Sequence, residues 1–232
     1  RYQWSSSNTF GFIKKSKLIN TSHSAVKVSL LDGIQNIMPA SIGSDEQNQS
    51  SNLVDAYKRN ELEEKTGLGI FALSAILVDK AEASEALKAN IVWSTGLDNP
   101  KHLLSSLQLN NFRLGKSIKQ EVDVKAEKGA YFLNSDIILE KGSSKEWMII
   151  ANVNQNHSSI AKLSKQIKEE SSLVDIVNDD INIGTKRLVE LNSASDAIQI
   201  TSDNLKDTRH FANTLFNIMR GGIFDNNYQI EK

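Results

Sequence analysis

The sequence lacks cysteine altogether and contains few prolines and few aromatic residues. The absence of cysteine excludes disulfide bonds and thiolate metal sites, although it does not identify the compartment in which the protein works. Two prolines among 232 residues favour long strands and long helices over a loop-rich scaffold. The chain also lacks an excess of charge of either sign, because its formal net charge is -1. Such a balance gives no electrostatic reason to bind nucleic acid or an anionic membrane, and we expect neither partner.

Long hydrophobic runs and the common catalytic motifs are missing as well. The longest apolar run, residues 69–78, is about half the length needed to cross a bilayer and predicts a buried strand. The sequence has no glycine-rich phosphate loop between a strand and a helix, and no Gly-x-Ser-x-Gly nucleophile elbow. Its four histidines have no spacing that places two of them on one face of a helix or strand. We therefore expect no metal site and no cofactor.

The hydrophobic pattern changes near residue 155. Before this point apolar residues mostly alternate with polar ones, as they do in half-buried strands. After it they recur at spacings of three and four, as they do on one face of a helix. We therefore predict a mainly β fold with an α-helical C-terminal part. It comprises an antiparallel β-sandwich over residues 1–155 and a helical linker segment over residues 156–232 that packs on the sandwich.

Turn signals and strand patterns assign the elements of the front part. Asp32-Gly33 is typical of a tight turn, because glycine tolerates positive φ and Asp bonds its own backbone. Residues 41–52 are polar without periodicity, which predicts a loop, and residues 53–62 could form a short helix. In the first strand, Phe10 and Phe12 are expected on one face. The expected strands are 10–20, 26–30, 34–38, 69–78, 87–93, 130–139 and 146–153, the last two forming a hairpin, with mixed short elements over 101–128.

The back part predicts three helices. The first follows Ser158 or Ser159 as a cap, and the second carries an apolar stripe over residues 173–191 with a longer step across Gly184. The third begins near Asp203 and ends at Gly221-Gly222, since glycine accepts the left-handed conformation at a helix end. One face is formed by Leu205, Thr208, Ala212, Leu215 and Met219, and Phe211 and Ile218 widen it.

Three residues are candidates for contact with a substrate. Aromatic planes pack on the CH-rich faces of sugar rings, and Trp4 lies near a chain end where a core position does not constrain it. By contrast, Trp93 and Trp147 have the inward parity of their strands, which predicts core positions. Arg220 and Asn226 follow the third helix and could border a ligand cleft; alternatively, this polar edge anchors a neighbouring domain. No residue is assigned a catalytic role.

Five strings of residues are distributed over most of the chain: Tyr2-Gln3-Trp4, Phe10-Gly11-Phe12, residues 31–39, residues 128–132 and residues 209–224. Together they resemble the N-terminal region of large bacterial cellobiose-phosphorylase-like proteins. The resemblance implies a galactose-mutarotase-like β-super-sandwich followed by linker helices. It also implies that the general acid and the phosphate-binding residues belong to an (α/α)6 barrel that follows the linker, so that no catalytic residue carries over to this chain.

Three hypotheses on function follow. In the first, the chain, which opens with Arg1, is a piece of a larger glycoside phosphorylase- or hydrolase-like protein. It is then a non-catalytic, carbohydrate-associated domain that shapes a substrate cleft or a subunit contact. Its partners are a carbohydrate, the neighbouring catalytic domain and a second copy in a homodimer. In the second, the chain is a ligand-binding sensory or adhesive ectodomain whose helices transmit a signal. The third, a free-standing epimerase-like enzyme, requires a cleft with a histidine close to a carboxylate.

Overall fold

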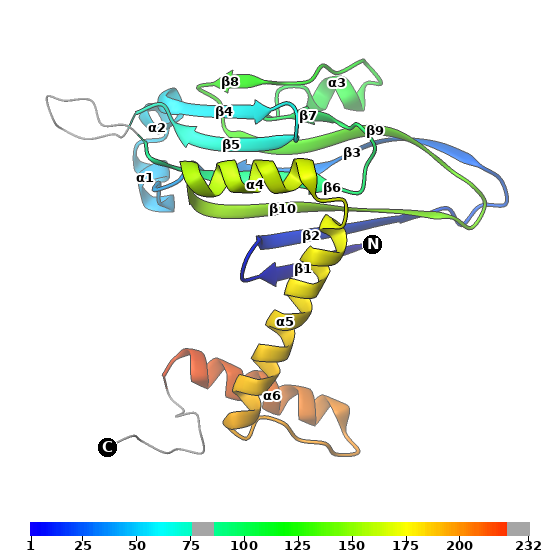
Figure 1. Ribbon diagram of the computed structural model, residues 1–232, viewed down its shortest axis with the longest axis vertical. Coiled ribbons are helices and arrows are strands. Elements are labelled where there is room, and N and C mark those ends of the chain that lie inside the picture. The colour runs from blue at the N-terminus through cyan, green and yellow to red at the C-terminus, as the bar shows by residue number, and fades with distance from the viewer. Residues whose placement is uncertain (76–85, 222–232) are drawn as a thin grey trace, which may run out of the picture. The chain divides into compact units, whose positions relative to one another are not determined.

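In the described part of the chain, ten strands lie between residues 2 and 156 and form two antiparallel sheets (Figure 1). A computed structural model describes residues 1–75 and 86–221. The larger sheet has the order β1-β2-β10-β6-β5-β4-β8, and the smaller sheet has the order β3-β9-β7. The strands are β1 (Tyr2–Ser7), β2 (Gly11–Ile19), β3 (Val26–Ile37), β4 (Lys58–Glu63), β5 (Leu68–Leu73), β6 (Lys88–Thr95), β7 (Lys101–Leu103), β8 (Asp123–Lys125), β9 (Gly129–Leu139) and β10 (Ser144–Asn156). This arrangement confirms the predicted mainly β, antiparallel, sandwich-like fold with helices in its C-terminal part.

The main core lies between the two sheets, where alternate side chains of each sheet meet. Tyr131 of β9 is fully buried and donates a 2.6 Å hydrogen bond to the carbonyl oxygen of Gly67, at the start of β5. Trp147 of β10 is buried in the same cluster, as predicted. The other buried members are Leu62, Phe71, Val92, Leu104, Leu133 and Ile149. Burial of apolar area at this layer is the principal contribution to the stability of the sandwich.

The predicted turn at Asp32-Gly33 is wrong, because β3 runs straight through it from Val26 to Ile37 and pairs with β9 along its length. The side chain of Asp32 is buried and points across to the larger sheet. There it accepts hydrogen bonds from Lys14 Nζ, from Ser16 Oγ at 2.9 Å and from Trp147 Nε1 at 2.7 Å. Three donors from the opposite sheet satisfy the carboxylate in the middle of a strand, so Asp does not mark a chain reversal here.

Three further expectations about residues 1–155 are corrected. Strands β9 and β10 do not pair with each other, because β9 lies between β3 and β7 whereas β10 lies between β2 and β6. A strand has only two edges, and both edges of each strand are already occupied. The polar segment 41–52 is not a loop: it contains helix α1 (Ser44–Gln49) and the start of α2 (Ser51–Tyr57). The helix predicted over 53–62 ends at Tyr57, where β4 begins.

The expectation that Phe10 and Phe12 lie on one face of a strand is wrong. Phe10 precedes β2 and packs edge-on against Trp93, with the ring centroids 6.0 Å apart. Gly11 has a φ of +85°, a conformation that interrupts the simple alternation of a strand. Phe12 therefore lies on the opposite face of the larger sheet from Phe10 and is 58% exposed.

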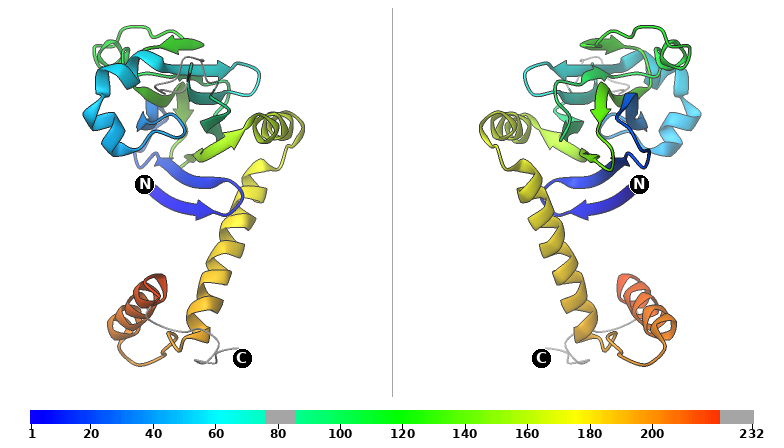
Figure 2. Two further views of the ribbon diagram at one scale, coloured as in Figure 1. Left: turned by 90° about the vertical axis from the view of Figure 1, so that its left-hand side faces the viewer. Right: turned by 90° about the vertical axis from the view of Figure 1, so that its right-hand side faces the viewer.

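Helix α4 (His157–Glu169) covers part of the outer face of the larger sheet (Figures 1 and 2). Its N-cap is Asn156, whose side chain accepts a hydrogen bond from the Ser159 backbone N–H, so the predicted cap at Ser158 or Ser159 is wrong. Ser164 and Lys168 of α4 bond to Glu63 at the end of β4. The remaining short helix, α3 (Leu109–Arg113), lies between β7 and β8, in the region predicted to hold mixed short elements.

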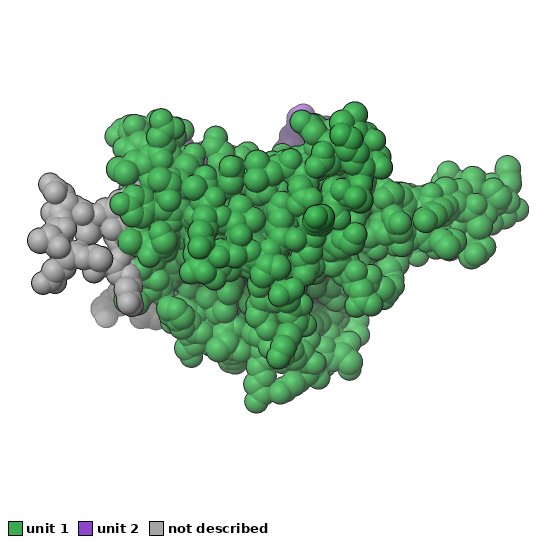
Figure 3. Space-filling model, turned by 90° about the horizontal axis from the view of Figure 1, so that it is seen from above, with its two compact units in different colours: residues 1–177 green, residues 178–232 purple. Residues whose placement is uncertain are grey.

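The chain divides into two units, residues 1–177 and 178–232 (Figure 3). The first contains both sheets, α4 and the beginning of α5 (Leu173–Ala194). The second contains the rest of α5 and α6 (Asn204–Met219). The predicted helices are thus confirmed, with Asp203 capping α6 by accepting from the backbone N–H groups of Leu205 and Lys206. None of the helices in the described ranges is long and apolar enough to span a membrane.

The apolar face predicted for α6 is mostly exposed. Leu205 and Met219 are 57% and 76% exposed, Leu215 is half-buried, and Thr214 is the one buried side chain of this helix. His210 contacts the backbone oxygen of Asp196 at 2.9 Å. The covered side of the helix carries His210, Phe211, Thr214 and Ile218, and thus includes the two residues that were expected to widen the apolar face.

Candidate functional site

Three exposed aromatic side chains lie on one face of the β1–β2 hairpin. They are Tyr2, Trp4 and Phe12, which are 71%, 63% and 58% exposed. In the register of the two strands Tyr2 lies opposite Ser16, Trp4 opposite Lys14, and Ser6 opposite Phe12. Residues two apart on a strand share a face, so these three side chains point to the same side. We call them the aromatic row.

The aromatic row lies on the face of the larger sheet that faces the smaller sheet, at an edge that the smaller sheet does not cover. Strand β1 forms one edge of the larger sheet, next to β2 (Figure 2). Asp32, on the edge strand of the smaller sheet, bonds Lys14 and Ser16 of β2. The smaller sheet therefore covers β2 at these residues, whereas Tyr2 and Trp4 on β1 remain exposed to solvent.

A buried ion pair, Lys14 with Asp32, lies beside the aromatic row. Lys14 and Asp32 are both buried, and Lys14 also donates to the Gly33 carbonyl oxygen at 3.2 Å. The Lys14 ammonium lies 4.8 Å from the centroid of the Tyr2 ring, within the range of a cation–π interaction. This contact covers one face of the Tyr2 ring and leaves most of the side chain exposed.

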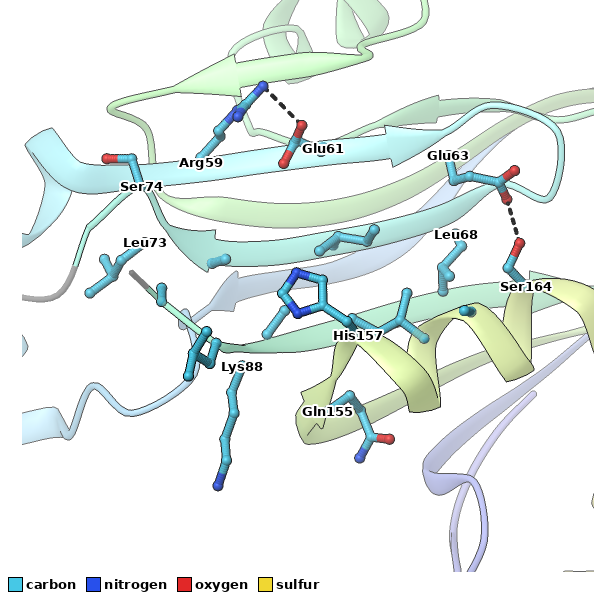
Figure 4. Close-up of a pocket in the computed structure, with 17 residues that line it drawn as sticks. Arg59, Glu61, Glu63, Leu68, Leu73, Ser74, Lys88, Gln155, His157 and Ser164 are labelled. Carbon is cyan, nitrogen blue, oxygen red and sulfur yellow. Dashed lines mark hydrogen bonds and ion pairs between the residues drawn. The ribbon is translucent and has the colours of Figure 1, made fainter. Parts of the chain in front are cut away.

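A second candidate site is a groove of about 490 Å³ on the outer face of the larger sheet, between α4 and the strands β4 and β5 (Figure 4). Its apolar lining comes mainly from β5 and α4, with Leu68, Ile70 and Ile160 among its members. Polar side chains border it: Arg59, Glu61, Glu63, Lys88, Gln155, His157 and Ser164.

The charges that border the groove are largely paired with each other. Arg59 bonds Glu61 at 2.9 Å and Asp123 at 3.2 Å, and these acidic partners raise the pKa of Arg59. Glu63 accepts from Lys168 at 2.9 Å and from Ser164 at 3.2 Å. Burial alone would raise the pKa of Glu63, but the hydrogen bonds from Thr66 and Lys168 outweigh it and lower the pKa. A carboxyl group with a lowered pKa stays ionised at neutral pH and is a poor general acid.

The groove contains one histidine and two glutamates, the residue types that an epimerase requires close together. His157 lines the same groove as Glu61 and Glu63, and Figure 4 shows its ring directed over the groove. In the described ranges, no hydrogen bond joins His157 to either glutamate, since Glu61 pairs with Arg59 and Glu63 with α4. The described residues also contain no group of three or more His, Asp or Glu placed to hold a metal ion.

The structure describes two of the three predicted site residues. Trp4 lies in β1, within the first unit, and is exposed, as its position near a chain end indicated. Arg220 follows α6 in the second unit, where its guanidinium lies 5.3 Å from the centroid of the Phe216 ring. Asn226 lies outside the described residues. Sequence reasoning missed Tyr2 and Phe12. The alternation Tyr2-Gln3-Trp4 was a signal that Tyr2 and Trp4 point to the same face of a strand, whereas no local pattern indicated Phe12.

Comparison with known proteins adds no identification. No family model matches the sequence, and no curated protein matches it significantly. The resemblance to cellobiose-phosphorylase-like proteins therefore stays a prediction.

Proposed function

We propose that the chain is a non-catalytic, carbohydrate-associated module of a larger glycoside phosphorylase- or hydrolase-like protein. The observation that carries this proposal is the aromatic row, three exposed rings side by side on one face of an edge hairpin. Exposed aromatic residues in such an arrangement are costly to leave in water and favour a function in binding. The sandwich architecture and the resemblance in sequence support the same reading.

The chemistry of the aromatic row suits a neutral sugar. Ring faces offer apolar contact to the CH groups of a pyranose, and Ser6 places a hydroxyl on the same face of β1. The one cation on this face, Lys14, is bonded to Asp32 and to the Gly33 carbonyl oxygen. An anionic ligand would therefore compete with a buried ion pair, whereas a neutral sugar would not.

Isothermal titration of the full chain with glucose, cellobiose and galactose, and with soluble polysaccharides, tests the proposal. The test variant is Trp4→Ala, and the matched control is Gln3→Ala, which alters the adjacent exposed residue on the opposite face of β1. We expect binding that Trp4→Ala abolishes and Gln3→Ala preserves. Uniformly null binding to every sugar would contradict the proposal.

The sensory or adhesive alternative finds its own support in α5. The stripe predicted over residues 173–191 is divided: Leu173 and Val177 are buried in the first unit, whereas Leu188 and Leu191 of the second unit are 39% and 41% exposed. An exposed apolar stripe on a helix could pair with a second copy of itself. Concentration-dependent dimerisation in sedimentation equilibrium, lost in a Leu188→Lys variant, would favour this alternative; a monomer at all concentrations would speak against it.

A further inference from the structure

We infer that the aromatic row binds an extended, unbranched glycan chain across several sugar rings, and not the end of a chain or a single sugar. This inference rests on the proposed function and specifies its ligand. It depends on the length of the row, its exposure, its area and its charge.

The row is long and straight. Tyr2, Trp4 and Phe12 occupy three successive levels of the same hairpin face, because Phe12 lies opposite Ser6. Four residues of strand separate the first level from the last, which is roughly 14 Å at the usual rise per residue. Phe12 lies on the neighbouring strand, so the row crosses the hairpin obliquely. A row of this length exceeds one sugar ring and matches a short oligosaccharide.

The row is also widely exposed to solvent. All three side chains are more than half exposed, and none of them belongs to the groove between α4 and the strands β4 and β5. A chain-end or monosaccharide site is normally concave, so that polar groups surround the ring. A row of exposed rings favours a ligand that presents its apolar ring faces one after another, as an extended β-1,4-linked glucan does.

The area of the row by itself is smaller than a whole protein interface. At their exposed fractions the three side chains offer about 400 Å² if a whole aromatic side chain contributes roughly 200 Å². A stable protein interface needs about 800 Å² from each partner. A flexible, neutral oligosaccharide requires less area, and no uncompensated charge on this face opposes it, since Lys14 is paired with Asp32.

The test is a chain-length series measured by isothermal titration on the full chain, with glucose and its β-1,4-linked oligomers up to the hexamer as probes. We expect affinity to rise with length up to the tetramer or beyond. Tyr2→Ala and Phe12→Ala, which shorten the row at either end, should each weaken hexamer binding roughly tenfold, or ~1.4 kcal/mol, and reduce the gain with length. Ile138→Ala, which truncates a 70% exposed apolar residue on β9, is the matched control and should change nothing.

The possible results separate the two proposals. Equal affinity for glucose, cellobiose and the hexamer, with sensitivity to Trp4→Ala alone, would overturn the extended-chain inference and leave the carbohydrate function intact. Absence of binding to every probe and polysaccharide would overturn both. A length-dependent gain that Tyr2→Ala and Phe12→Ala both reduce would support both.

Discussion

Replacement of Asp32 by alanine should strongly destabilise the sandwich. Asp32 is 7% exposed and accepts from Lys14, Ser16 and Trp147, so its removal leaves a buried ammonium, a hydroxyl and an indole N–H without their partner. Breaking a buried ion pair by removing one partner typically costs about 3–5 kcal/mol. For a chain of this size, each kcal/mol lowers the melting temperature by roughly 2–4 °C, which gives a decrease of about 6–20 °C.

Urea denaturation followed by tryptophan fluorescence measures this effect, because Trp147 lies at the affected contact. The double variant Lys14→Met with Asp32→Leu removes both charges and should recover much of the lost stability, since apolar residues of similar volume often replace a buried pair without loss. Replacement of an exposed pair, Lys145→Ala at its 2.9 Å contact with Asp98, is the control and should cost less than about 1 kcal/mol. If Asp32→Ala unfolds at the same urea concentration as the parent, the proposed bond between β3 and the larger sheet is wrong.

Three further predictions concern single residues. Burial lowers the pKa of His102 below its ordinary value of 6.5, although a hydrogen bond with Gln120 partly opposes this. As the pH falls, His102 therefore binds a proton in the unfolded chain before it does so in the folded chain, and the free energy of unfolding should decline below about pH 6.5. An equal decline between pH 7.5 and 5.5 in a His102→Gln variant would show that His102 is not its cause. Asp203→Ala removes the cap of α6 and should cost about 1 kcal/mol, visible as faster hydrogen exchange of the first-turn amides; unchanged exchange would count against the cap. Leu215→Ala should cost roughly 1–2 kcal/mol, below the usual range for a buried leucine, because Leu215 is half-buried; a larger loss would show that its face is covered.

The helices of the back part and the core positions of the front part were accessible from the sequence, because local periodicity and caps determine them. Helix α6 begins next to Asp203 as predicted, and Trp93 and Trp147 are buried. Asp32 was misplaced because its Asp-Gly pair is typical of turns, and the donors that keep it inside a strand are far away in the sequence. The wrong pairing of β9 with β10 has a similar cause. Their partners are strands distant in sequence, and the short segment between them does not determine the pairing.

The candidate site was predictable in part. The exposure of Trp4 followed from its position, but its grouping with Phe12 depends on the register of β1 on β2. The sequence placed Phe12 on the same face as Phe10, whereas the positive φ of Gly11 separates them. The groove between α4 and β5 joins segments about a hundred residues apart, a proximity that no local pattern reveals.

Nuclear magnetic resonance of the tryptophan indoles tests the central claim most directly. The chain has three tryptophans, of which Trp4 is 63% exposed whereas Trp93 and Trp147 are 1% and 4% exposed, so the two buried indoles serve as internal controls. Titration of the ¹⁵N-labelled full chain with the hexamer of β-1,4-linked glucose should shift the Trp4 indole N–H signal and leave the other two in place. Three unmoved indole signals at saturating hexamer, or shifts confined to Trp93 and Trp147, would contradict sugar binding by the aromatic row.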